Sequence, residues 1–233
     1  MDTCVITLIY KLRNNRMKKL ATILLSFLFI SLQSVKADTG IGITGAAHMF
    51  DVSGTETTRT SGESNPGSHS ETAVIPELFI EAILDNGGAV GLAYIPTRNM
   101  GSKSRSDTNS DGDTGTYKAE AELDNVFQIY ADIPTSLSLV GYDIYAKVGL
   151  QHATINSLES LNSGSTYPNQ DVIGYTLGLG TKGDLPVSNL YYKADLTYTD
   201  FEDYTAESDS SPANKVTADL EDVAFKLSIG YKF

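Results

Sequence analysis

The stretch FKLSIGYKF, residues Phe225–Phe233, is the last segment of the sequence and decides how the rest is interpreted. Every second residue is large and apolar, and small or charged residues stand between them. The apolar set is Phe225, Leu227, Ile229, Tyr231 and Phe233. Alternation with a period of two predicts a β-strand with one apolar and one polar face. Chain ends are usually polar and frayed, so an aromatic residue that ends a strand in register needs a specific explanation.

The same alternation recurs along the chain, whereas no long segment has the spacing of an amphipathic helix. Eight strands are predicted, at residues 40–50, 73–84, 88–96, 119–132, 139–151, 171–182, 189–200 and 220–233. The connections alternate in length. Three are short, at residues 85–87, 133–138 and 183–188, and four are long and polar, at residues 51–72, 97–118, 152–170 and 201–219. Strands that run up and down in sequence order place all four long connections at one end. The sequence therefore predicts an all-β fold, an eight-stranded antiparallel up-and-down β-barrel.

Alternation alone does not decide which face points outward. A soluble barrel has apolar side chains inside, whereas a membrane barrel has them against lipid and polar ones in the lumen. Glycines 174, 178 and 180 fall on the polar face, where a crowded eight-stranded lumen requires small residues. Apolar-face tyrosines near both predicted strand ends, such as Tyr192 and Tyr198, are typical of interfacial girdles. These features favour a transmembrane β-barrel.

The first 37 residues have the order of a secretory signal. Basic Met17-Lys18-Lys19 precedes the apolar run of residues 20–32, which is followed by QSVKA. The alternative is a retained helix, but this run is shorter than the roughly 18 residues that a membrane span needs. The sequence predicts an N-terminal extension and cleaved signal over 1–37, cleavage between Ala37 and Asp38, and a barrel over 38–233. Residues 1–16 precede the signal, and either Met1 or Met17 fits as the start.

Removal of residues 1–37 makes the protein strongly acidic. That segment carries six of the 17 basic residues, one of the 29 acidic residues and the single cysteine, Cys4, so residues 38–233 have a net charge of −17. Nucleic acid is excluded as an expected partner, because phosphate binding requires a basic face. Disulfides cannot stabilise a chain that lacks cysteine.

The aromatic-terminated last strand resembles the C-terminal assembly signal of bacterial outer-membrane barrels, which the barrel-assembly machinery recognises. Its matching residues are Phe225, Leu227, Ile229, Tyr231 and Phe233. With the signal segment and eight strands, residues 38–233 resemble the small eight-stranded families: opacity proteins, the transmembrane domain of outer membrane protein A, and outer membrane protein W. The resemblance is architectural. It implies location in the bacterial outer membrane, outer-membrane lipid as surroundings and no cofactor.

One loop motif and three histidines are candidate sites. Asp107, Asn109, Asp111 and Asp113 match the start of a calcium-binding loop, D-x-[DN]-x-[DN]-G. The twelfth position is Lys118 instead of Glu, so a flexible acidic loop is the alternative. His48 and His152 are predicted near the long-connection rim, where some eight-stranded enzymes modify lipid A. No nucleophile stands at a distinctive spacing from either, and an enzyme is not the expectation.

Charged residues on the polar faces are predicted to meet in the lumen. They are Glu77, Asp124, Lys147, Asp195 and Lys226, with Asp124 beside Lys147 and Asp195 beside Lys226. Buried charges must be paired, so a plug of ion pairs is expected, with a narrow pore as the alternative. The expected role is structural or surface-interactive, through envelope integrity or adhesion, with possible partners at the four long loops. The alternatives are a narrow porin-like channel for small or apolar solutes and a lipid A-modifying rim enzyme.

Overall fold

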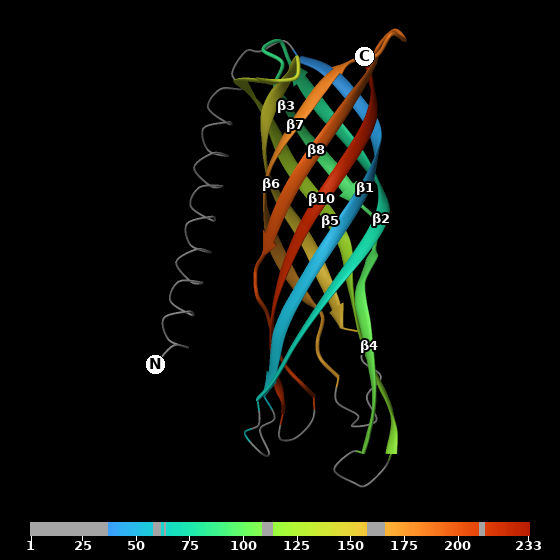
Figure 1. Cartoon of the computed structure of the whole chain (residues 1–233), viewed down its shortest axis with the longest axis vertical. Coiled ribbons are helices and arrows are strands. Elements are labelled where there is room, and N and C mark those ends of the chain that lie inside the picture. The colour runs from blue at the N-terminus through green and yellow to red at the C-terminus, as the bar shows by residue number, and fades with distance from the viewer. Residues whose placement is uncertain (1–36, 58–61, 63, 109–113, 158–165, 210–212) are drawn as a thin grey trace.

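The computed structural model describes residues 37–57, 62, 64–108, 114–157, 166–209 and 213–233, which form a tall β-barrel (Figure 1). Ten strands are present in this part of the chain: β1 (Ala37–Thr57), β2 (Ser64–Leu84), β3 (Ala89–Ile95), β4 (Arg98–Thr108), β5 (Thr114–Leu139), β6 (Tyr142–Ser157), β7 (Gln170–Asp184), β8 (Leu190–Phe201), β9 (Tyr204–Glu207) and β10 (Lys215–Lys232). A search of the same residues found no helix with the length and apolar character needed to cross a membrane.

Eight of the strands close into a ring. They pair antiparallel in the order β1, β2, β3, β5, β6, β7, β8 and β10, and β10 pairs back onto β1. The closing register places Ile229 opposite Ile43 and Leu227 opposite Gly45. Closure leaves no strand at a free edge of the ring, although β2 pairs with β3 only as far as Leu78. The predicted eight-stranded up-and-down barrel is confirmed, and the last segment of the chain closes it.

The other two strands, β4 and β9, continue β3 and β8 beyond short interruptions. Pro96 and Thr97 separate β3 from β4, and Glu202 and Asp203 separate β8 from β9. β4 pairs with β5, and β9 pairs with β10. Both pairs extend the wall at the end of the barrel that carries the long hairpins, which we call the long-hairpin end.

The prediction of four long loops is largely wrong. β1 and β2 stay paired out to Thr57 and Ser64, and β4 and β5 out to Thr108 and Thr114, so most of residues 51–72 and 97–118 are strand. The other two predicted loops, 152–170 and 201–219, are also partly strand. Their strand residues include 152–157, 204–207 and 215–219. These hairpin ends extend beyond the apolar exterior, and only some of their inward residues, such as Val52 and Met100, are apolar. Their sequence therefore lacks the apolar alternation that identifies a strand in the membrane, although their backbones still pair.

One of the three short connections is also placed differently. The turn between β5 and β6 is formed by Val140 and Gly141, with φ angles of 52° and 85°. The predicted connection at residues 133–138 lies inside β5, where the register with β6 shifts between Pro134 and Ser138. A β-branched residue at positive φ is uncommon, so Val140 is not recognisable as a turn residue from the sequence. The turn at Asp85–Gly88 agrees with the prediction.

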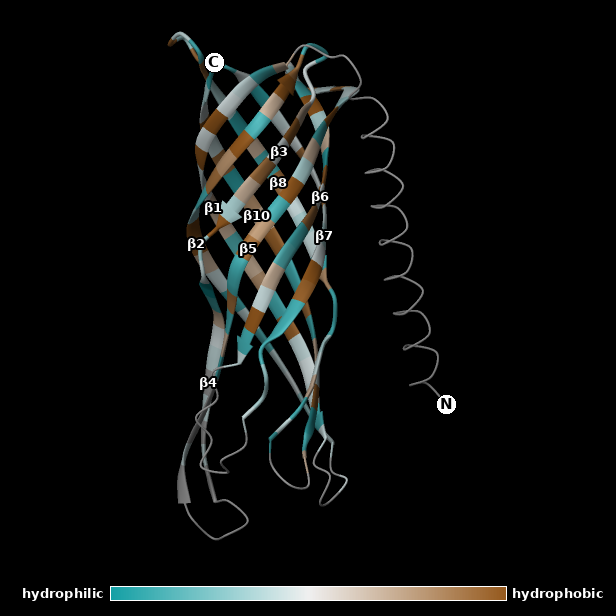
Figure 2. Cartoon of the chain, turned by 180° about the vertical axis from the view of Figure 1, so that it is seen from behind, coloured by the Kyte–Doolittle hydropathy of each residue, from teal (hydrophilic) through white to brown (hydrophobic). Residues whose placement is uncertain are grey.

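The barrel has an apolar exterior. The outward side chains from Phe225 to Tyr231 in β10, and Phe233 just after it, are 41–73% exposed, whereas the alternating Lys226 and Ser228 are buried. Brown and teal positions alternate along the strands over most of the barrel, and the hairpin ends are mostly pale or teal (Figure 2). This arrangement is the reverse of a soluble barrel and matches a wall that faces lipid.

The interior is divided into two parts along the barrel axis. Nearer the short turns, which we call the short-turn end, it contains charged and tyrosine side chains from all parts of the ring. Nearer the long-hairpin end it is an apolar cluster that includes Phe50, Ile95, Leu123, Phe201 and Leu220. Tyr167 extends into this cluster, and its neighbour Thr166 hydrogen-bonds to Asp209.

Candidate functional site: the barrel lumen

The centre of the polar lumen is an ion-pair network of two lysines and three carboxylates. Lys193 Nζ lies 2.6 Å from both Glu81 Oε2 and Asp132 Oδ2. Lys147 Nζ lies 2.8 Å from Asp132 Oδ1 and 3.7 Å from Asp195 Oδ1. All five side chains are almost completely buried. Each lysine therefore joins carboxylates from two strands, and the network crosses the lumen from β2 to β8.

Three tyrosines surround this network and donate to its carboxylates. Tyr130 and Tyr191 donate to Glu81 at 2.6 and 2.9 Å, and Tyr145 donates to Asp195 at 2.5 Å. The rings also occupy space that water would otherwise fill. The cavity between the ion pairs measures about 20 Å³, room for roughly one water molecule.

A second charged group lies between the central network and the apolar cluster. Lys226 Nζ lies 2.8 Å from Glu77 Oε1, and the same oxygen is 2.9 Å from His48 Nε2. The other ring nitrogen, His48 Nδ1, is 2.8 Å from Asp222 Oδ2. Arg98 lies beside this group with its guanidinium over the Phe50 ring, 5.0 Å from the centroid. An imidazole held by carboxylates on both nitrogens has no nitrogen left to act as a general base.

A layer of uncharged polar side chains fills the lumen next to the ion pairs, on the side formed by β5, β6, β7 and β8. Gln128 and Gln151 donate to Thr176 Oγ1 at 3.1 and 3.2 Å, and Gln151 also donates to Thr199. These four side chains are buried. Buried polar groups are tolerated when they are hydrogen-bonded to one another, and this layer fills the lumen next to the ion pairs.

Four of the five predicted lumen charges lie in the interior, but the predicted pairs are not formed. Lys147 pairs with Asp132, which is directly opposite it in the β5–β6 register. The β5–β6 register shifts between Asp124 and Phe127, and Asn125 has a φ of 51°. Asp124 consequently lies on the exposed outer side of the wall instead of in the lumen, and it accepts a hydrogen bond there from Thr97.

The predicted pair of Asp195 with Lys226 is also wrong. Their backbones are directly opposite each other in β8 and β10, yet Lys226 extends the other way, across β1, to Glu77. Ala46 is the neighbour of Lys226 on β1, and its small side chain leaves that route open. Asp195 instead pairs with Lys147 and Tyr145.

Sequence reasoning missed three of the five residues of the central network. Glu81, Asp132 and Lys193 occupy polar-face positions of predicted strands, so the alternation that identified Lys147 could also have identified them. His48 was expected at the rim but is completely buried, because β1 continues nine residues beyond it to Thr57.

The remaining predicted sites stay predictions. Asp107 lies in β4, paired with Gly115, and Asn109, Asp111 and Asp113 lie outside the described residues. Within the described part of the chain, no three His, Cys, Asp or Glu side chains are grouped to hold a metal ion. Ala37 and Asp38 begin β1, and most of the signal segment precedes the described residues.

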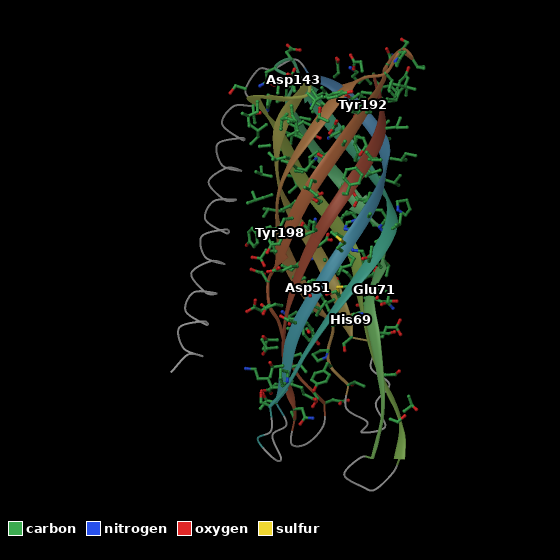
Figure 3. All side chains as sticks on the ribbon, viewed as in Figure 1. Asp51, His69, Glu71, Asp143, Tyr192 and Tyr198 are labelled. Carbon is green, nitrogen blue, oxygen red and sulfur yellow. The ribbon has the colours of Figure 1, made fainter. Side chains whose placement is uncertain are left out.

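A closed ring of eight antiparallel strands, apolar outside and polar inside, defines this chain as a small integral β-barrel of the bacterial outer membrane. Tyr192 lies at the short-turn end and Tyr198 nearer the long hairpins (Figure 3), as expected for two interfacial girdles.

No family model and no curated protein sequence matches the chain. Solved structures with a similar fold are outer-membrane barrels. The outer membrane protease OmpT of Escherichia coli is 8% identical with a TM-score of 0.48, over 87% of this chain and all of that one. Outer membrane protein AlkL in lipid bilayers is 11% identical with a TM-score of 0.47, over 87% and 93%. Ail, the attachment invasion locus protein of Yersinia pestis, is 13% identical with a TM-score of 0.36, over 82% and 99%.

Proposed function

We propose that this protein is a non-conducting outer-membrane barrel with a structural or surface-interaction role. The observation that carries this proposal is the ion-pair network that fills the lumen between Glu81, Asp132, Lys147, Lys193 and Asp195. A conducting pore needs a continuous column of water, and the cavity within this network accommodates about one water molecule.

The charges in the network also oppose ion passage. A permeating ion would have to separate Lys193 from Glu81 and Asp132, and unpaired charges are costly in a low-dielectric interior. Eight strands enclose an interior that side chains can fill. The sealed lumen therefore supports a role at the surface of the barrel instead of a role in passive diffusion.

The long hairpins are the surfaces available for interaction. The ends of β1–β2 and β4–β5 extend beyond the apolar exterior and carry mostly polar residues. Surface partners at these hairpins, outer-membrane lipid around the barrel and the assembly machinery at the last strand are part of the proposal. A catalytic role is not part of the proposal. Both ring nitrogens of His48 are held by buried carboxylates, which supports leaving catalysis out.

Single-channel recording tests the proposal. Purified protein in a planar bilayer is expected to show no steady current, whereas the Tyr130→Ala, Lys193→Ala double variant, which removes bulk and a central cation, is expected to conduct. Leu196 is exposed on the lipid-facing side, so the Leu196→Ala variant serves as the control for insertion into the bilayer. Steady, selective current through the unaltered protein would overturn the non-conducting assignment and favour the porin-like alternative.

A further inference from the structure

One buried cation of the lumen lacks a hydrogen-bond partner. Arg98, the first residue of β4, is 4% exposed, and its nitrogens Nε, Nη1 and Nη2 have no partner among the described residues. Its guanidinium lies over the Phe50 ring, which attracts a cation but offers no oxygen as an acceptor. An arginine is always charged and carries five N–H donors. Leaving these donors without an acceptor in a buried position is costly.

The carboxylates closest to this cation are bonded to other residues. Asp222 and Glu77 are the two charged groups that act most strongly on Arg98. Asp222 Oδ2 is 2.8 Å from His48 Nδ1, and Lys226 Nζ lies 2.8 and 2.9 Å from the two oxygens of Glu77. Neither carboxylate is hydrogen-bonded to Arg98. The protein therefore surrounds the guanidinium with negative charge at a distance but gives it no direct counter-ion.

The hydrogen bonds of His48 determine the net charge around Arg98. An ionised carboxylate accepts hydrogen bonds and cannot donate them. His48 Nδ1 and Nε2 face carboxylate oxygens at 2.8 and 2.9 Å, so the two contacts together require two protons. A neutral imidazole supplies only one. The second proton makes the ring an imidazolium or sits on one of the carboxyl groups, and the total charge is the same in both cases.

The buried group that results has an excess of one positive charge. We call it the His48 group, and its members are His48, Glu77, Arg98, Asp222 and Lys226. Three cations and two anions give it a net charge of +1. All five side chains are almost completely buried, so water does not screen this charge. An uncompensated charge in a protein interior is strongly unfavourable, and a counter-ion is therefore expected.

The neighbouring central network does not supply the missing negative charge. Its three carboxylates are matched by Lys147, by Lys193 and by a third lysine, Lys182. Lys182 is directly opposite Lys193 in the β7–β8 register, and its Nζ is buried 5.8 Å from the centroid of the Tyr145 ring. Asp132 is among the charged groups that act on it. Three lysines and three carboxylates leave the central network neutral, so the excess charge stays with the His48 group.

We propose that Arg98 binds a monovalent anion of halide size inside the barrel. One negative charge neutralises the His48 group, and the nearby carboxylates of Asp222 and Glu77 would repel an anion of higher charge. The burial of Arg98 favours a small ion over a phosphate or a sugar acid. A water molecule could accept the same hydrogen bonds, but it would leave the positive charge in place. This site goes beyond the structural role and does not depend on surface partners.

Halide-dependent stability tests the proposal in lipid vesicles. Urea unfolding is measured while sodium chloride replaces sodium gluconate at constant ionic strength, since gluconate is too large for the site. The urea midpoint of the unaltered protein should rise with chloride and then level off. An ion that binds only the folded state raises the ratio of folded to unfolded protein about 100-fold at 100 times its Kd. Lys232→Met, which removes a cation paired with the exposed Asp184, is the control and should keep this response.

Two variants remove the excess charge in different ways. Arg98→Met removes the guanidinium, so its urea midpoint should exceed that of the unaltered protein in gluconate and should not respond to chloride. His48→Gln keeps Arg98 but removes the extra proton, which makes the group neutral, and the chloride response should again be lost. A chloride response of equal size in the unaltered protein and in both variants would overturn the proposal.

Crystals of the unaltered protein grown in sodium bromide locate the ion directly. Anomalous scattering should show a bromide within hydrogen-bonding distance of an Arg98 nitrogen. Density for water alone at this position, with no anomalous signal, would overturn the proposal, because the neutral molecule leaves the charge uncompensated. Conductance plays no part in these measurements, so their failure is distinguishable from failure of the non-conducting assignment.

Discussion

Lys226 of β10 and Glu77 of β2 form an ion pair with Nζ and Oε1 2.8 Å apart, although β1 lies between their strands. The pair spans the position where the last strand closes onto the first. It therefore connects three strands at the closure of the ring, and His48 of the intervening β1 shares the same carboxylate oxygen.

Loss of one partner from this pair should be strongly destabilising. Lys226→Met leaves the buried Glu77 carboxylate without its lysine partner, and breaking a buried pair typically costs about 3–5 kcal/mol. The free energy of unfolding, measured by urea titration in lipid vesicles, should fall by an amount in this range. Lys232→Met is the matched control. Its partner Asp184 is 73% exposed, and surface pairs contribute about 1 kcal/mol or less. Equal losses in the two variants would contradict a structural role for the buried pair.

Two glycines three residues apart on β1 should respond in opposite ways to alanine. A Cβ on Gly42 would lie 2.3 Å from the backbone oxygen of Ile229 and 2.5 Å from the Phe79 ring, whereas a Cβ on Gly45 meets nothing within 4 Å. Overpacking costs about 1–3 kcal/mol, so Gly42→Ala should lower the urea midpoint. Gly45→Ala should leave it unchanged or raise it slightly, because alanine restricts the unfolded chain. Comparable destabilisation by both variants would show that crowding at Gly42 is not the cause.

The membrane-facing part of the fold was predictable because lipid imposes a strict rule on it. Alternate residues such as Leu227 and Ile229 must be apolar there, and the pattern is visible in the sequence. Above the apolar exterior that rule no longer applies. Strand continuations such as residues 51–57 and 98–108 then depend on backbone pairing, which leaves little trace in composition.

The lumen was predictable in kind but not in detail. The polar faces identified Lys147, Lys226 and Glu77 as interior charges, but the partner of a long side chain depends on what its neighbours leave open. Ala46 directs Lys226 toward Glu77, and an irregularity near Asn125 turns Asp124 to the outer side of the wall. Before the register is known, it is not possible to say which residue is the cross-strand neighbour of a long side chain. The position of an extra residue in a strand is equally unknown at that stage.

A carboxyl group at the long-hairpin end should make stability pH-dependent. Partial burial raises the pKa of Asp219 to about 6 from 3.8, with support from a hydrogen bond to Asp203 and the nearby charges of Asp200 and Glu221. A raised pKa means that the folded state holds the proton more tightly than the unfolded state. Proton binding by Asp219 therefore contributes to the stability of the folded state. The stabilisation is fully present below pH 3.8 and is lost as the pH rises through about 6.

Asp219→Asn should remove this dependence. The urea midpoint of the variant should exceed that of the unaltered protein at pH 7.5, and the difference should shrink between pH 6 and pH 4 as Asp219 takes up its proton. Asp209→Asn is the control of opposite sign, because hydrogen bonds from Thr166 lower the pKa of Asp209. A stability difference for Asp219→Asn that is constant from pH 4 to pH 7.5 would be inconsistent with a raised pKa.

The aromatic end of β10 should matter more for assembly than for stability. Phe233 is 73% exposed, its ring contacts only Tyr231 among the aromatic pairs of the described residues, and its N–H donates to Thr39 O at 2.9 Å. Deletion of Phe233 therefore removes one backbone bond and little packing. If the residue belongs to an assembly signal, the deletion should sharply reduce the yield of folded barrel in cells, measured by heat-modifiable gel migration. The urea midpoint of the protein refolded from the purified chain should change little. Phe127→Ala removes an aromatic ring of similar exposure from β5, outside the proposed signal, and should assemble at normal yield. Normal yield and rate for the Phe233 deletion would leave the residue with only a strand-closing role.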